Sequence, residues 1–347
     1  MTGKIPDGPR RGRRREEPTM AAIARLAGVS APTVSRVLNG RSGVASETRR
    51  QVAALLREHG YRRPSAADPA PSVEVVFYGL ESHLAVSILR GVEEVVRQQD
   101  FAVGFTDVLS RAVTQHSWAE QLLARRPVGV IAAHSYFTAQ EYAVLAAGGI
   151  PLVALDPSGV PPDAVPSVGA ANWSGGIAAA RHLLELGHRR IAVIGGPARS
   201  LIARARLEAC RAALDAAGVP LEERFLRTGR FFFEDGLEFG RDLLTSPDPP
   251  TAVLCGNDLQ ALGVYEAARQ AGLTIPDDLS VVGFDDLEYT RWCGPPMTTV
   301  RQPFEEMGAT AATLVLAFAA GEPPSQTRVE LPTTLVIRAS TGPPPRH

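Results

Sequence analysis

The sequence has 347 residues and a formal net charge of −1, which is enough chain for a small domain and one large two-lobed domain. Its three cysteines are widely spaced, which excludes a disulfide scaffold and favours reduced thiols, and no apolar run approaches the ~20 residues that a membrane-spanning helix needs. Residues 1–65 hold 14 Lys and Arg against 5 Asp and Glu, a net charge of +9, whereas the rest of the chain carries −10, as expected for a nucleic-acid module joined to a larger effector domain.

Residues 18–40, PTMAAIARLAGVSAPTVSRVLNG, have the pattern of two short helices joined by a tight turn. Gly28 stands at the turn, where glycine adopts a positive φ with little strain, and apolar residues recur at helical spacing on either side. Ser30 occupies an N-cap position, its hydroxyl placed to accept a hydrogen bond from the amide of Thr33, and Pro32 falls in the first turn of the second helix. The polar outer side of this helix suits a DNA major groove, and a generic helical hairpin with a solvated polar face is the alternative.

A third helix is expected over residues 46–58, where Val52, Leu55 and Leu56 close a three-helix core. The first two helices resemble the DNA-binding headpiece of the LacI/GalR family of bacterial transcription regulators, whose signature reads close to T-x-x-x-I-A-x-x-A-G-V-S-x-x-T-V-S-R-V-L-N. The resemblance implies that the second helix reads operator DNA.

Arg36 is the side chain of that helix that can make a bidentate contact to guanine, worth ~1–3 kcal/mol of discrimination. Ala31 and Pro32 offer only apolar contact, for instance to a thymine methyl group. Phosphate contacts that fix the register are expected from nearby hydroxyl and amide side chains, namely Thr19, Ser30, Thr33, Ser35 and Asn39.

Two segments that flank the headpiece differ from the family's pattern or add to it. Family members usually continue into a hinge helix whose Leu wedges into the minor groove, but residues 64–71 read PSAADPAP, with no such Leu and with Pro69 biasing Asp68 out of the helical region. The sequence therefore does not favour a hinge helix that folds on DNA. An arginine cluster at residues 10–15 is a candidate for a DNA-contacting arm, with a solvated tail as the alternative.

From residue 73 the chain alternates short β-branched runs with longer helical stretches. Strands are expected over residues 73–79, 101–108, 129–134, 151–156, 190–196, 251–256 and 279–285. Helices are expected over residues 83–98, 114–125, 138–147, 174–186, 202–217, 234–245, 258–271 and 303–320. Continuous apolar strands joined by helices indicate parallel sheets covered on both faces, and the number of units exceeds one comfortable sheet. We therefore predict an α/β fold of two Rossmann-like lobes, with a ligand cleft outside the carboxyl ends of the strands.

The expected organisation follows from these patterns. It consists of a basic arm (1–17), a helix-turn-helix domain (18–63), a Pro-rich hinge (64–72), an effector-binding domain (73–341) and a tail (342–347). Lobe 1 is expected to comprise approximately residues 73–168 and 299–325, and lobe 2 residues 169–298 and 326–341.

The body also resembles the LacI/GalR effector domain, which is similar to periplasmic sugar-binding proteins and carries no enzymatic activity. The matching motifs lie at residues 186–197, 203–214, 251–273, 279–286 and 295–308. The resemblance places ligand contacts on Arg206, Asn257 and Asp285, and more loosely on Gln302 and Phe304. A guanidinium, an amide and a carboxylate can each hold two vicinal hydroxyls, as a neutral sugar requires. Further candidates are the flat rings of Phe231 and Trp173 and, from the first lobe, Ser82, His83, Leu84 and Asp156.

Several of these positions have structural alternatives. Asp258 and Asp286 are expected to complement a helix N-terminus and to brace a turn rather than to bind ligand. At least one residue of 231–233, FFF, is expected in the core because alternation sends neighbours to opposite sides, and for Trp173 core packing is as good an expectation as stacking. The histidines show no metal-ligand spacing, and no nucleophile elbow, P-loop, H-E-x-x-H or G-x-G-x-x-G motif occurs. We therefore expect no metal, no cofactor and no enzymatic activity.

These expectations combine into one function. The chain is expected to be a cytoplasmic repressor that binds a palindromic operator in double-stranded DNA as a homodimer and responds to a small sugar or related metabolite, without contact to a membrane. No Leu heptads follow the stretch TTLVIRAS, which favours a dimer over a tetramer held by a coiled coil. The alternatives are a stand-alone sugar-binding protein and a sugar-metabolising enzyme, and the sequence leaves open whether the ligand releases or recruits DNA.

Overall fold

The structure is a computed structural model that falls into two compact units, Met1–Pro69 and Ala70–His347. It describes residues 20–30, 33, 34, 37, 44–58, 71–77, 84–108, 118–133 and 138–345.

The first unit holds two helices of the expected headpiece, α1 (Met20–Leu26) and α3 (Ser46–Glu58), with helical residues between them. Gly28 has a φ of 62°, and the Ser30 hydroxyl accepts a hydrogen bond from the Thr33 amide at 3.4 Å, as the capping pattern predicts. One buried apolar cluster joins these segments and consists of Ile23, Ala24, Ala27, Val34, Val52 and Leu56, with Leu55 packed against it.

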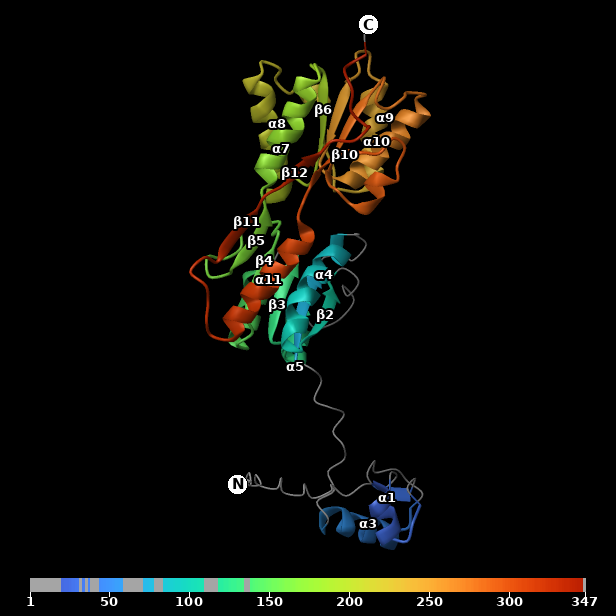
Figure 1. The fold of residues 1–347 in the computed structure, drawn as a ribbon, viewed down its shortest axis with the longest axis vertical. Coiled ribbons are helices and arrows are strands. Elements are labelled where there is room, and N and C mark those ends of the chain that lie inside the picture. The colour runs from blue at the N-terminus through green and yellow to red at the C-terminus, as the bar shows by residue number, and fades with distance from the viewer. Residues whose placement is uncertain are drawn as a thin grey trace, which may run out of the picture. The chain divides into compact units, whose positions relative to one another are not determined.

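The described residues of the second unit form two six-stranded sheets, here called sheet A and sheet B (Figure 1). Sheet A has the order β11-β5-β4-β3-β1-β2 and is parallel throughout; its strands are β1 (Ser72–Phe77), β2 (Ala102–Asp107), β3 (Gly129–Ala133), β4 (Leu152–Leu155), β5 (Ser167–Ala170) and β11 (Arg328–Leu331). Sheet B has the order β12-β10-β9-β8-β6-β7; its strands are β6 (Ile191–Gly195), β7 (Leu226–Thr228), β8 (Ala252–Cys255), β9 (Ser280–Asp285), β10 (Thr298–Arg301) and β12 (Thr334–Val336). Only β12 runs antiparallel in sheet B, so the predicted class of two parallel α/β lobes is confirmed.

Helices cover both faces of each sheet (Figure 1). On sheet A these are α4 (Leu84–Val96) with α11 (Phe304–Ala319) on one face, and α5 (Trp118–Arg125) with α6 (Ala139–Ala147) on the other. On sheet B they are α7 (Asn172–Glu185) with α8 (Leu201–Ala216), and α9 (Phe233–Leu244) with α10 (Asp258–Gln270). The continuous apolar strands thus bury both faces, as expected of parallel strands. No helix in the described part of the chain is long and apolar enough to span a bilayer.

Five short strands were absent from the sequence prediction: β5, β7, β10, β11 and β12. Each has three or four residues, and several of them carry Thr, Ser or Arg side chains. β7, β11 and β12 lie at sheet edges, where one side of the strand needs no apolar residues. A strand of this kind does not produce the continuous apolar run on which the prediction depends.

The chain passes between the sheets three times: between β5 and α7, between β10 and α11, and between β11 and β12. These three passages, here called the crossings, lie near residues 171, 302–303 and 332–333. The expected lobe boundaries differ from them, because β10 belongs to sheet B and β11 to sheet A. Sequence reasoning assigned β10 to lobe 1 and β11 to lobe 2 because it recognised neither segment as a strand.

Candidate functional site

A buried guanidinium lies at the centre of the candidate site. Arg206 on α8 is 7% exposed, and its Nε donates to Asn172 Oδ1 at 2.8 Å. Its Nη1 donates to the carbonyl oxygen of Gly256 at 2.6 Å and lies 3.5 Å from Asp285 Oδ1, while the guanidinium carbon lies 3.7 Å from the centre of the Phe284 ring. The guanidinium is therefore held in place by the protein, and its Nη2 makes no hydrogen bond within the described residues.

Asp285 is the last residue of β9, where parallel strands present their carboxyl ends. Burial raises the pKa of Asp285 to about 6, while Arg206 and a hydrogen bond from Gln302 act to lower it and Asp156 acts to raise it. The Gln302 Nε2 donates to Asp285 Oδ1 at 2.6 Å, but the Gln302 Oε1 is buried and has no hydrogen-bond partner among the described residues. A buried acceptor without a partner is costly, and a ligand hydroxyl would satisfy it.

The ring of Phe231 forms an aromatic wall beside the guanidinium, with 5.9 Å between its centre and Arg206 Cζ. Its backbone has a φ of 73°, a strained value for a residue with a side chain. The ring fits against two glycines: a Cβ atom on Gly196 would lie 2.0 Å from the ring, and one on Gly256 would lie 2.9 Å from it. Only glycine at these positions leaves room for the ring.

The prediction that one residue of 231–233 belongs to the core is wrong. Phe232 is 47% exposed, and its two neighbours are half-buried and outside the core. Residues 229–232 form an irregular segment with a bend at Phe231 that leads into α9 and not a strand, so the strand alternation on which the prediction relied does not apply.

Asn257 is the N-cap of α10, and both ends of its amide contact the protein. Its Oδ1 accepts from the amide of Gln260 at 3.0 Å, and its Nδ2 donates to the carbonyl oxygen of Phe231 at 2.9 Å. The contact to Phe231 helps to fix the strained backbone there. The second hydrogen on Nδ2 has no acceptor among the described residues.

Asp258 follows at the first position of α10 and is fully buried. Its Oδ1 accepts from the hydroxyl of Thr299 at 2.6 Å, and its Oδ2 accepts from the amide of Leu287 at 2.9 Å. Burial and the charge of Asp285 raise its pKa well above the usual range. The prediction that Asp258 is structural is confirmed.

Comparisons with known proteins agree with this arrangement. The family model for bacterial regulatory proteins of the lacI family matches residues 19–64, and the model for the periplasmic binding protein-like domain matches residues 180–341. The transcriptional regulator CelR of Thermobifida fusca is 34% identical over 339 residues, which cover 94% of this chain and 99% of the relative. The chain belongs to the LacI family. The transcriptional repressor CytR of Escherichia coli K12 is 29% identical over 328 residues, covering 93% of this chain and 96% of the relative.

Solved structures of LacI-family proteins share the fold. The complex of the regulator CelR with cellobiose has a TM-score of 0.69 at 32% identity, and the lac repressor dimer bound to operator and the anti-inducer ONPF has a TM-score of 0.69 at 30% identity. Each comparison covers 93% of this chain and 99% of the other. The relatives are transcription regulators and not enzymes, and this LacI-family chain is a DNA-binding transcription regulator.

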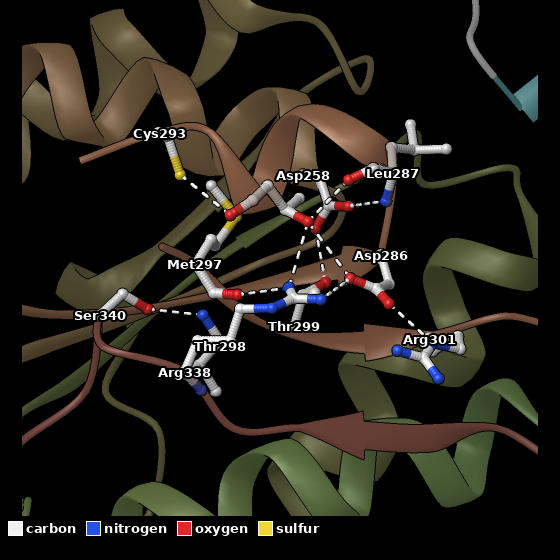
Figure 2. Close-up of polar contacts among 11 residues, drawn as sticks. Asp258, Asp286, Leu287, Cys293, Met297, Thr298, Thr299, Arg301, Arg338 and Ser340 are labelled. Atoms are coloured by element: carbon white, nitrogen blue, oxygen red, sulfur yellow. Dashed lines mark hydrogen bonds and ion pairs between the residues drawn. The ribbon is translucent and has the colours of Figure 1, made fainter. Parts of the chain in front are cut away.

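Asp286 braces the turn after β9, as predicted for this position in the LacI-family chain. Its φ is 57°, and its carboxylate accepts hydrogen bonds from Arg301 Nε at 2.7 Å, from Arg338 and from Thr290. Figure 2 shows the two arginines on opposite sides of this carboxylate, with Asp258 reaching Leu287 beside it. Sequence reasoning identified the brace but neither arginine, because they come from β10 and from the C-terminal segment.

The other predicted ligand contacts occupy different environments. Asp156 is 2% exposed and directly follows β4, while Leu84 is partly buried against the core of sheet A. Phe304, at 4% exposure, belongs to that same core. Trp173 is 50% exposed, which excludes the core alternative. Ser82 and His83 lie outside the described residues.

The space beside Arg206 is small in this structure. A cavity of about 20 Å³, which is room for one water molecule, is lined by Arg206 together with Gly196, Gly256, Cys210 and Cys255 among others. A cavity of about 390 Å³ lies elsewhere, between α6, α11 and the start of β4, and none of the predicted ligand contacts lines it. A sugar at Arg206 therefore requires more space than the 20 Å³ cavity provides.

In the headpiece, two of the predicted DNA contacts are described. The hydroxyl oxygens of Ser30 and Thr33 lie 2.9 Å apart, so the N-cap interaction engages both of them. The remaining predicted contacts lie outside the described residues: Thr19, Ala31, Pro32, Ser35, Arg36 and Asn39. The arm (1–17) and hinge residues 64–70 also lie outside the described residues.

Proposed function

We propose that this LacI-family regulator is a cytoplasmic repressor that binds a palindromic operator as a homodimer and releases or engages it in response to a small neutral sugar. The observation that carries the ligand assignment is the buried trio of Arg206, Asp285 and Gln302, with the unpaired acceptor Gln302 Oε1 beside them. Adjacent hydroxyls of a sugar can donate to that oxygen and to the carboxylate while accepting from the free Nη2 of Arg206.

The charge at this site favours a neutral ligand. The single guanidinium of Arg206 is accompanied by the carboxylates of Asp285 and Asp156, both of which raise its pKa against the lowering effect of burial. A phosphate or carboxylate group on the ligand would meet these two carboxylates in a desolvated place, which is unfavourable. Cellobiose is the first sugar to test, because the relative CelR was solved in complex with it.

The headpiece supports the operator assignment. The net charge of +9 over residues 1–65 provides nonspecific attraction to phosphates, and we propose that Arg36 supplies the base-specific contact, with Thr19, Ser30, Thr33, Ser35 and Asn39 on the phosphates. A dimer presents two such headpieces to the two halves of a palindrome. The lac repressor, a structural relative, was solved as an operator-bound dimer.

An operator-shift assay tests the whole assignment. The DNA that flanks the protein's own coding region is titrated with the full-length protein, first alone and then with a panel of mono- and disaccharides that includes cellobiose. We expect a specific shifted complex at nanomolar protein concentration and at least a tenfold change in its affinity with one sugar. A complex that no sugar alters would contradict the ligand class, and binding without sequence preference would contradict the operator assignment.

A further inference from the structure

The buried pair of Arg206 and Asp285 is connected to two of the three crossings between the sheets. Gln302, at the second crossing, donates to Asp285, and Asn172, at the end of the first crossing, accepts from Arg206. Each charged partner is thus held by an amide side chain that stands where the chain passes from one sheet to the other. No motif in the sequence points to Asn172.

The Asn172 side chain bridges the two sheets. Its Oδ1 accepts from Arg206 Nε at 2.8 Å, and its Nδ2 donates to the carbonyl oxygen of Ala170, the last residue of β5 in sheet A, at 3.0 Å. A guanidinium only donates and a carbonyl only accepts, so the two contacts admit one orientation of the amide. Asn172 is 8% exposed, and both hydrogen bonds are buried.

The backbone beside Asn172 connects the first crossing to the third. The amide of Ala171 donates to the carbonyl oxygen of Leu331 at 2.8 Å, and the Thr333 hydroxyl donates to the carbonyl oxygen of Ala171 at 3.1 Å. A displacement of Arg206 is therefore transmitted by the Asn172 side chain to residues 170–171 of the first crossing, whose backbone is hydrogen-bonded to the third crossing. These hydrogen bonds form a continuous path from Arg206 through Asn172 to the first and third crossings.

We propose that Asn172 is a positioning residue that fixes the Arg206 guanidinium against Asp285 and couples it to the crossings, so that ligand binding at this pair and the relative orientation of the two sheets influence each other. Without Asn172 the Nε donor of Arg206 is buried without a partner, and the guanidinium rotates away from Asp285 to find one. The part of this inference that concerns ligand rests on the proposed function, whereas the positioning of Arg206 does not.

The test measures Asp285 itself, because its carboxyl group responds to the distance of the guanidinium. The pKa of Asp285 is followed by carbon NMR in full-length protein, with the signal assigned by its absence in Asp285→Asn, and compared among the parent, Asn172→Ala and Asn172→Ser. Arg206 lowers this pKa, whereas Asp156 raises it, and Asp258 is a further carboxyl group coupled to Asp285. Because the guanidinium moves away when Asn172 is lost, we expect the pKa of Asp285 to rise by about one unit in Asn172→Ala and by less in Asn172→Ser. Ser174→Ala, an exposed position on α7, is the matched control and leaves the titration unchanged. An unchanged titration in both Asn172 variants overturns the proposal.

Two further measurements keep the outcome decisive. In the parent protein, the Nε proton of Arg206 is expected to exchange with solvent at least a hundredfold more slowly than those of exposed arginines, so rapid exchange refutes the positioning even if the variants fail to fold. Cellobiose affinity, measured by calorimetry, is expected to fall about tenfold in Asn172→Ala and to remain unchanged in Ser174→Ala. If the parent binds no cellobiose while the Asp285 shift is observed, the choice of ligand fails and the positioning of Arg206 stands.

Discussion

In each lobe a covering helix supplies an arginine to a buried carboxylate: Arg125 of α5 pairs with Glu74, and Arg206 of α8 pairs with Asp285. These two pairs differ in how completely the described residues satisfy them. In sheet A, Glu74 near the start of β1 accepts from Arg125 Nη1 at 2.8 Å and from the Thr106 hydroxyl, which in turn accepts from Arg125 Nη2 at 2.8 Å. Beside sheet B, Arg206 Nη1 lies 3.5 Å from Asp285 at the end of β9, and its Nη2 has no hydrogen-bond partner among the described residues. The first pair is closed and lies away from the strand ends where ligands bind, while the second has capacity left for a ligand. We therefore assign the first pair a structural role and propose that the second takes part in ligand recognition.

The largest expected effect comes from removing Arg206, the arginine of the pair that keeps capacity for a ligand. Arg206→Met leaves Asp285 buried without its cation, which costs about 3–5 kcal/mol, and eliminates a ligand donor. We expect cellobiose affinity to fall more than a hundredfold in calorimetry. Arg204→Met, an exposed position on the same helix, is the matched control and should bind as the parent does. Near-parental cellobiose affinity in Arg206→Met would show that the Arg206–Asp285 pair is no more involved in ligand binding than the Arg125–Glu74 pair.

A third arginine extends the comparison to DNA. Arg36→Ala should lose about 1–3 kcal/mol of base discrimination in each half-site, leaving weak, salt-sensitive binding that no longer distinguishes operator from unrelated DNA. Fluorescence anisotropy with operator and scrambled duplexes measures this ratio. Arg25→Ala, an exposed position on α1, should retain the preference for operator. Undiminished specificity in Arg36→Ala would contradict its role as base reader.

The raised pKa of Asp285 predicts a pH dependence of stability. Its folded-state pKa of about 6 exceeds its ordinary value of 3.8, so the folded protein binds this proton more tightly and becomes more stable as the pH falls from 7 to 4. Between pH 7 and pH 4 the gain relative to Asp285→Asn amounts to roughly 2 kcal/mol in urea unfolding. Sugar binding should weaken over the same range, since a protonated Asp285 no longer balances Arg206. Equal pH profiles for both proteins would show that Asp285 does not titrate there.

Breaking the closed pair of Arg125 and Glu74 should lower the free energy of unfolding and leave sugar binding unchanged. Arg125→Met leaves Glu74 buried without its cation, and because the Arg125 side chain is 43% exposed we expect a loss of about 2 kcal/mol in unfolding free energy, less than for a fully buried pair. Cellobiose binding at a temperature where the variant is folded should match the parent. A selective loss of binding would show that this pair also belongs to the site.

The smallest effect is expected from removing the Asp235 carboxylate, which holds the backbone on both sides of Phe231. The Asp235 carboxylate accepts from the amides of Arg230 and Phe232, which flank the strained Phe231. Asp235→Ala should free that backbone and weaken cellobiose binding about fivefold, or roughly 1 kcal/mol. The exposed neighbour Glu234, changed to Gln, is the control. Parental cellobiose affinity in Asp235→Ala would show that the position of the Phe231 ring does not depend on the hydrogen bonds of Asp235.

Local patterns predicted much of this molecule because their causes are local. The Gly28 turn, the Ser30 cap and the continuous apolar strands depend on residues close in sequence, and all are present in the structure. Asp258 at a helix start and Asp286 in a turn were identified for the same reason.

Contacts over long sequence distances were not predictable in this way. Glu74 and Arg125 lie 51 residues apart, and Asn172 and Arg206 lie 34 apart, so no local pattern pairs them. The placement of Arg206 in the site came from resemblance to a family, since an arginine within an amphipathic helix is ordinarily exposed. Short edge strands escaped prediction because they lack an apolar run.

The order in which the sheets receive their strands has a consequence for synthesis. β11 completes an edge of sheet A and β12 an edge of sheet B; both come from residues 328–336, and Arg338, which pairs with Asp286, follows two residues later. During translation neither lobe can reach its full hydrogen bonding until that stretch has left the ribosome, so nascent chains hold two unfinished sheets at once. A premature stop before residue 328 would leave both sheets incomplete, whereas a stop directly after Leu331 would remove only β12 and the Arg338 contact from sheet B.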